Sequence, residues 1–126
     1  MDRGFDVASA ARTLFEREAE LRELRRRLHE RASTDCGRII EMIVRDFRPR
    51  RVIQWGSLLE PESFDEHSDI DIAVEGLGGA QRFLDLHGRA FRMTDFSLDI
   101  VELERTDPSG RDSILRRGKV VYERDG

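Results

Sequence analysis

The residues best suited to chemistry in this sequence are two aspartates that flank a single isoleucine. Asp69 and Asp71 stand in a segment where polar and apolar residues alternate, which is typical of a strand with one buried face. Both carboxylates would then lie on one face, about 7 Å apart at the backbone. Two such charges repel unless a cation lies between them, and Mg²⁺ binds one or two carboxylates together with substrate phosphates. The pair indicates a magnesium site, although a solvated polar strand face would have the same pattern.

A third aspartate and a glycine–serine pair could complete such a site. Asp99 lies within the apolar run Phe96–Val101, where a carboxylate is costly to bury unless it is paired or binds a metal; on an edge strand it would face solvent. Gly56 and Ser57 follow a short apolar segment. Glycine lets the backbone come close to a ligand, and the serine hydroxyl can donate to a phosphate oxygen. Gly-Ser alone is ordinary in turns, but the three features together predict phosphoryl-transfer chemistry with paired cations.

Four strands and three helices are expected to position these residues. The strands are Arg51–Trp55, Ser68–Glu75, Phe96–Leu103 and Lys119–Glu123. One helix follows the glycines after the second strand, over about Ala80–Phe91. Another helix is expected between Asp107 and Gly118. Asp107 is its N-cap, Pro108 is its first residue, and Gly118 ends it. The order α-β-β-α-β-α-β indicates the α+β class, with helices packed against a small mixed sheet.

The first helix is predicted to be unusually long. Apolar residues recur at steps of three, four and seven from about Phe5 to Phe47, and Pro49 then ends the helix. We favour one continuous helix, with a kink near Ser33–Gly37 as the alternative. Its early part has more apolar residues than a small domain can cover. We therefore expect another chain, either a second copy or a helical partner, to pack against Leu14, Leu21, Leu24 and Leu28.

Length, charge and cysteine content indicate the size and the general class of this protein. The 126 residues suit a single domain, 1–126, with a core over about 51–123 after the helix at about 5–47. Net charge is −4, and the arginines around Arg25 are spaced to pair with glutamates four residues away, so we do not expect direct nucleic-acid binding. Cys36 is the single cysteine, and no apolar run suggests a signal peptide or a membrane span. We expect a cytoplasmic protein.

As an ordered set, Gly56-Ser57, Asp69-Ile70-Asp71 and Asp99 resemble the signature of the DNA polymerase beta nucleotidyltransferase superfamily. Within it, the minimal nucleotidyltransferase (MNT) family is the most similar branch, and the likeness runs from about Ile39 to Glu123. The resemblance implies that Asp69, Asp71 and Asp99 are the metal-binding and catalytic residues and that Gly56 and Ser57 contact the triphosphate, with Ser68 also beside the nucleotide. It further implies Mg²⁺ as cofactor and ATP, or another nucleoside triphosphate, as substrate.

The resemblance also suggests a protein partner. In the MNT family the acceptor is often a HEPN-domain ribonuclease toxin, silenced by AMP transfer to a tyrosine, which would make this chain an antitoxin. One departure leaves an alternative open. Family members usually follow the serine with a small residue, an arginine and a glycine, whereas here Leu58–Glu62 contains no arginine. The alternative is therefore an antitoxin-like interaction subunit that acts by binding alone.

Overall fold

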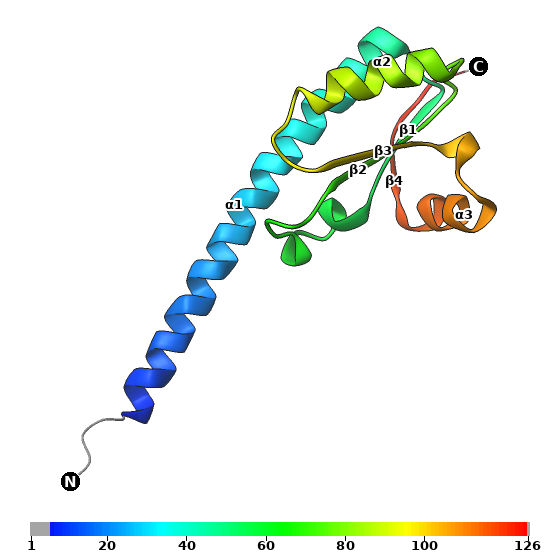
Figure 1. Cartoon of the computed structure of the whole chain (residues 1–126). Coiled ribbons are helices and arrows are strands. Elements are labelled where there is room, and N and C mark those ends of the chain that lie inside the picture. The colour runs from blue at the N-terminus through cyan, green and yellow to red at the C-terminus, as the bar shows by residue number, and fades with distance from the viewer. Residues whose placement is uncertain (1–5, 126) are drawn as a thin grey trace.

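The first helix is the longest element of the molecule. In the computed structural model, which describes residues 6–125, α1 spans Val7–Phe47 without a break and projects well beyond the sheet (Figure 1). The Asp6 carboxylate caps it by accepting a hydrogen bond from an amide of the first turn. The helix ends where Arg48 adopts a left-handed conformation, φ 46°, just before Pro49. The continuous helix that we favoured is confirmed, while Phe5 lies outside the described residues.

Only the second half of α1 packs against the rest of the chain. Its buried side chains begin at Ala32 and recur every three or four residues to the end of the helix, which is the spacing of one helix face. Before that point the apolar residues are solvated, and Leu14, Leu21 and Leu24 are 60%, 49% and 47% exposed. Leu28 differs from these three because it is half-buried and packs on the core of its own chain.

Two arginines of the arginine-rich stretch of α1, Arg26 and Arg27, pair with a glutamate of the same helix. Glu23 Oε1 lies 2.7 Å from Arg26 Nη2 and 3.2 Å from Arg27 Nε. The pairs are exposed and contribute little stability each, so this stretch is the solvated helix face that the charge spacing predicted. Within residues 6–125, no helix is long and apolar enough to cross a membrane.

The four strands form one sheet in the order β3-β2-β1-β4. Strand β1 (Arg51–Trp55) is antiparallel to both β2 (Ile70–Glu75) and β4 (Lys119–Glu123). Strands β2 and β3 (Leu98–Glu102) are parallel, because helix α2 (Ala80–Phe91) returns the chain to the same edge of the sheet between them. This mixed sheet with packed helices is the α+β class that the sequence predicted.

The two faces of the sheet are covered by different helices. One face carries Ile70, Ile72 and Val74, which join α1 and α2 in the main core. The opposite face carries Ala73, which packs in a smaller cluster with residues of β1 and of helix α3 (Pro108–Arg117). Side chains alternate along a strand, and Asp71 is two residues before Ala73. The Asp71 side chain therefore lies on the same face as Ala73, the face that α3 covers.

Strand β2 is shorter than the sequence pattern predicts. It begins at Ile70 instead of Ser68, because the preceding residues form a turn around Asp65. The Asp65 carboxylate accepts a hydrogen bond from the His67 amide, and its carbonyl accepts one from the Ser68 amide. Asp69 is therefore the residue before the strand and not a member of it.

Strand β3 is shorter than predicted at both ends. It begins at Leu98 instead of Phe96, whose amide donates to the hydroxyl of Thr94 in the preceding loop. It ends at Glu102, because Leu103 starts a short 3-10 turn. The bounds of β1, α2, α3 and β4 agree with the prediction.

Candidate active site

Asp71 and Asp99 lie side by side on neighbouring strands. They are partners in the parallel register of β2 and β3, and Asp71 is also opposite Trp55 in the antiparallel register of β1. Residues paired in this way have their side chains on the same face of the sheet. The two carboxylates therefore share the face that α3 covers, as strand alternation predicted.

Asp69 lies next to this pair but outside the sheet. Its side chain is exposed, between the turn at Ser68 and the start of β2. Its negative charge still reaches Asp71, whose pKa it helps to raise. The Ser68 hydroxyl is used within the turn, where it accepts a hydrogen bond from the Asp65 amide and donates one to the Asp65 carboxylate.

Asp71 is the buried member of the three aspartates. It is 8% exposed, whereas Asp69 and Asp99 are open to solvent. Burial first, and then the negative charges of Asp99 and Asp69, raise the pKa of Asp71 to about 7. A cation bound between these carboxylates would lower that pKa, because it favours the charged form.

Gly56 packs directly against the Asp71 carboxylate. Its φ of +82° lies in the left-handed region that glycine tolerates. A Cβ atom at this position would lie 2.1 Å from Asp71 Oδ2, far inside van der Waals contact. Ser57 follows, half-buried, in a short 3-10 helix, η1 (Gly56–Leu59). The fold thus brings the glycine–serine turn and the aspartates to one place.

η1 and the segment that follows it are held on α1. Leu58 and Phe64 are both buried. His29 Nε2 lies 2.8 Å from the carbonyl oxygen of Leu58 and donates to it, since a carbonyl can only accept. The His29 ring also meets Phe64 edge-on. These contacts fix the position of the turn that carries Ser57, while Glu60 remains exposed.

A hollow of about 310 Å³ opens between η1 and α3. It is lined by Trp55, Gly56, Ser57, Leu59, Glu60, Ser113, Ile114 and Arg117. The indole N–H of Trp55 is buried and has no acceptor among residues 6–125, which costs about 1–3 kcal/mol. Such an atom is of the kind that a ligand or an ordered water satisfies.

The donor set suits a hard cation. Carboxylate oxygens are the protein ligands that Mg²⁺ prefers, and it takes only one or two of them, together with water and substrate phosphates. Within residues 6–125, no three His, Cys, Asp or Glu side chains are gathered closely enough to enclose a metal. The pKa of Asp71 is nevertheless raised, first by burial and then by the negative charges of Asp99 and Asp69, and a bound cation would offset those charges. The residues present therefore fit a magnesium ion that a nucleotide helps to hold.

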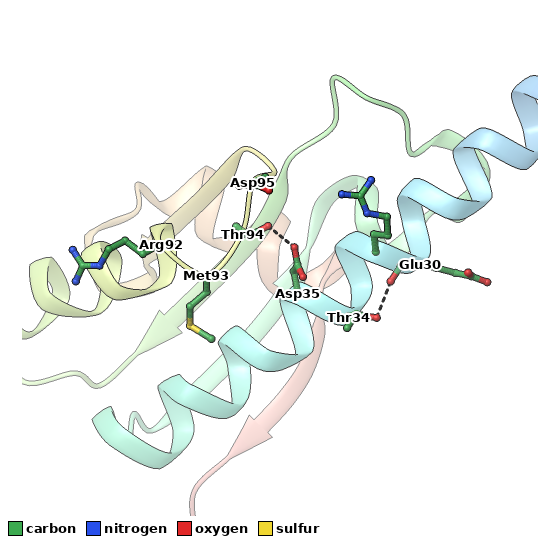
Figure 2. A pocket seen from close by; sticks show the side chains of 8 residues that line it. Glu30, Thr34, Asp35, Arg92, Met93, Thr94 and Asp95 are labelled. Carbon is green, nitrogen blue, oxygen red and sulfur yellow. Dashed lines mark hydrogen bonds between the residues drawn. The ribbon is translucent and has the colours of Figure 1, made fainter.

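A second hollow, of about 590 Å³, lies between α1 and the loop that joins α2 to β3 (Figure 2). There the Thr94 hydroxyl donates to the Asp35 carboxylate at 2.7 Å. This hollow is larger, but its lining includes none of the three aspartates and neither residue of the glycine–serine turn. None of the three aspartates lines the hollow at Gly56 either, but Gly56 and Ser57 do, and Gly56 packs against Asp71. We therefore assign the functional site to this hollow, where Gly56 meets the carboxyl whose pKa is strongly raised.

Comparison with known families agrees with this geometry. A family model described as "Polymerase beta, Nucleotidyltransferase" matches residues 37–126, which include all four strands. The chain belongs to the polymerase beta nucleotidyltransferase family. The resemblance drawn from the aspartates and the glycine–serine pair is confirmed at this level. No curated protein sequence is significantly similar to this nucleotidyltransferase-family chain.

A solved structure shares the fold. It is described as "Crystal structure of the toxin-antitoxin with AMP-PNP", and it superimposes on this chain with a TM-score of 0.57 at 22% sequence identity. The match covers 70% of this chain and 73% of that chain. At this identity the likeness shows a shared fold.

Sequence reasoning missed part of the site of this nucleotidyltransferase domain. Ser113 and Arg117 border the hollow, but they lie more than fifty residues after Ser57 in the sequence. Helix α3 itself was predicted from its N-cap and from Gly118. No local pattern in the sequence indicates that α3 borders the same hollow as η1, because that placement depends on the strand order of the sheet.

Proposed function

We propose that this protein is a Mg²⁺-dependent nucleotidyltransferase that transfers AMP from ATP to a hydroxyl of a protein partner. The observation that carries the proposal is the placement of Asp71 and Asp99 in register on one sheet face, with Gly56 packed against Asp71. Membership of the polymerase beta nucleotidyltransferase family supports the reaction class. A toxin–antitoxin complex with AMP-PNP has a similar fold, which supports the choice of nucleotide and of partner.

The site residues divide three roles between them in this proposal. Asp69 and Asp71 hold magnesium, which when bound neutralises charge on the triphosphate. Gly56 lets the backbone approach the phosphates, and the Ser57 hydroxyl donates to a phosphate oxygen, with Ser68 nearby. Asp99, exposed beside Asp71, completes the carboxylate set and accepts the proton of the acceptor hydroxyl.

The transfer exchanges one bond at phosphorus for another. The acceptor oxygen forms a bond to the α-phosphorus, and the bond from that phosphorus to the bridging oxygen of pyrophosphate breaks. The proton of the hydroxyl goes to Asp99, and pyrophosphate leaves with the electron pair of the broken bond. The protein contributes mainly by positioning these groups.

The proposed acceptor is a HEPN-type helical toxin, which places this chain in the MNT branch as an antitoxin. We propose that both act in the cytoplasm, where the single thiol of Cys36 stays reduced. That thiol takes no part in the chemistry, because burial first and the charge of Asp71 second raise its pKa to about 12.

A second candidate function is silencing of the partner by binding alone. The observation that favours it is the segment after Ser57, which forms 3-10 turns carrying the exposed Glu60 and Glu62 in place of a basic residue. Negative charge there opposes a triphosphate.

Calorimetry of ATP binding with and without Mg²⁺ separates the two candidates. If the protein is an enzyme, its binding of ATP depends on Mg²⁺. The substitution Asp71→Asn should then weaken ATP binding at least about tenfold, because the site loses a metal ligand. Asp85→Asn is the matched control, since Asp85 is an exposed α2 carboxylate that bonds only Gln81 among the described residues.

The second measurement is transfer itself. Labelled ATP is incubated with the partner protein, and mass spectrometry detects an added AMP. Wild type and Asp85→Asn should transfer, Asp71→Asn and Asp69→Asn should not, and Asp99→Asn should lose transfer while keeping more of its ATP binding. Absence of both Mg²⁺-dependent ATP binding and transfer in wild type, with partner binding intact, would favour silencing by binding alone.

A further inference from the structure

Arg117 is the positively charged residue among those that line the hollow beside Ser57. It is the last residue of α3 and is exposed. Among the described residues its guanidinium has no ion-pair or hydrogen-bond partner. The neighbouring arginine behaves differently, because Arg116 Nη2 lies 3.1 Å from Asp112 Oδ2 one helical turn earlier. Arg116 is thus paired on the helix surface, whereas Arg117 borders the site and can bind a ligand there.

Gly118 determines how closely the end of α3 approaches the site. A Cβ atom there would lie 2.6 Å from Ile53 Cγ2 and 2.5 Å from the carbonyl oxygen of Ile114. The lack of a side chain lets the helix end come directly onto β1, the strand that leads into the glycine–serine turn. Arg117, the preceding residue, is therefore held at the side of that turn.

The charge balance of the hollow makes this position significant. Its other charged lining residue is Glu60, and the segment from Leu58 to Glu62 has no basic residue. A triphosphate whose α-phosphate lies at Asp71 has its two remaining phosphates free to extend along the Ser57 side. Those phosphates carry most of the negative charge of the nucleotide, and a guanidinium is suited to bind them through paired N–H donors.

We propose that Arg117 binds the β- and γ-phosphates of the nucleotide and so takes the part of the arginine that the segment after Ser57 lacks. The inference rests on the proposed function, since it needs a nucleotide at the Gly56–Ser57 turn. It assigns a role to α3, which supplies a phosphate-binding residue from the far end of the chain.

Calorimetric titration of the full chain with ATP and with AMP, both with Mg²⁺, tests the proposal. Arg117→Gln should weaken ATP binding about tenfold or more, because a charge-assisted bond to phosphate is lost. AMP binding should be unchanged, since AMP lacks the two outer phosphates. Arg117→Lys should recover part of the ATP affinity, and Arg116→Gln should match wild type.

The midpoint of thermal unfolding of each variant is measured in parallel. Where it equals that of wild type within error, a change in affinity reflects a lost contact with the nucleotide and not a loss of fold. Equal ATP affinity for Arg117→Gln and wild type would overturn the role of Arg117 and leave the proposed function standing. Equal losses for ATP and AMP would also overturn it, because a phosphate-tail contact must discriminate between them. Failure of wild type to bind ATP with Mg²⁺ would overturn both proposals.

Discussion

Asp71 combines low exposure with two nearby carboxylates, so in the metal-free protein its charge opposes folding. Its pKa is raised from about 3.8 unfolded to about 7 folded. The carboxyl therefore costs no stability below about pH 4, and its cost grows until about pH 7, where ionisation becomes favourable in the folded state too. A residue proposed for catalysis is thus expected to be unfavourable for stability, as is common for functional sites.

We predict that Asp71→Asn stabilises the metal-free protein by about 1–2 kcal/mol near pH 8 and by almost nothing near pH 4. Urea unfolding in the presence of a chelator, repeated across that pH range, measures the difference from wild type. Addition of Mg²⁺ and ATP should reduce the difference, because the bound cation compensates the charge of wild type. A difference that is constant with pH would contradict the prediction.

Gly56 offers a steric test of the same site. Gly56→Ala combines a strained positive φ with a collision against Asp71 Oδ2, and we expect a loss of about 1–3 kcal/mol in unfolding free energy. Gly37→Ala is the matched control, because an added Cβ there meets nothing within 4 Å and Gly37 lies within α1. That control should gain up to about 1 kcal/mol from helix propensity. Thermal and urea unfolding of both variants give the answer; equal effects would refute the packing argument.

At the scale of elements, the loop before β3 is fastened to α1. The Thr94 hydroxyl donates to Asp35 (Figure 2). It also accepts from the Phe96 amide, so one side chain joins the helix to the loop just before the strand. Strand β3 then carries Asp99 to its place opposite Asp71. The position of an exposed site residue therefore depends on a contact in the other hollow.

Thr94→Val should cost about 1–2 kcal/mol of stability, because it removes both hydrogen bonds with little change of shape. Thr34→Val is the control, since its hydroxyl bonds only the Glu30 carbonyl of its own helix among the described residues, and it should cost much less (Figure 2). Hydrogen exchange of the Phe96 and Leu98 amides should accelerate in Thr94→Val alone. Unchanged exchange there would show that the loop is held by other contacts.

At the scale of the whole molecule, the first half of α1 stands apart from the folded core. Its Leu14, Leu21 and Leu24 are about half exposed or more, and the helix projects beyond the sheet (Figure 1). In proteins most of the stability of a helix comes from packing of its apolar face, which is open in this half of α1. We infer that a second copy of the chain or a helical partner covers the apolar residues of this half of α1. Leu28 is where the helix begins to pack on the core of its own chain.

Light scattering across micromolar concentrations, with and without the partner protein, tests this inference. Leu14→Gln with Leu21→Gln should weaken the association about tenfold or more, because each change removes buried apolar area from the interface. Arg12→Gln with Glu16→Gln is the control, since it changes the opposite side of the helix and leaves the net charge unaltered. A wild-type protein that stays monomeric in every mixture would refute the inference.

The sequence by itself determined the parts that depend on short-range chemistry. Pro49 ends α1, glycines precede α2, and Asp107 with Pro108 starts α3, so those elements were predicted at their observed positions. Strand alternation correctly placed Asp71 and Asp99 on corresponding faces. The predicted second strand was too long at its start. There the Asp65 carboxylate accepts a hydrogen bond from the His67 amide, and a turn forms in place of the strand.

Only the tertiary structure decided which of these parts meet. The strand order β3-β2-β1-β4 puts Asp99 opposite Asp71 and Gly56 against its carboxylate. It also brings the end of α3, with Arg117, beside Ser57 across a long stretch of sequence. The physical reason is that these contacts join segments distant along the chain, whose pairing is selected by burial of the whole core and is not encoded in any local pattern.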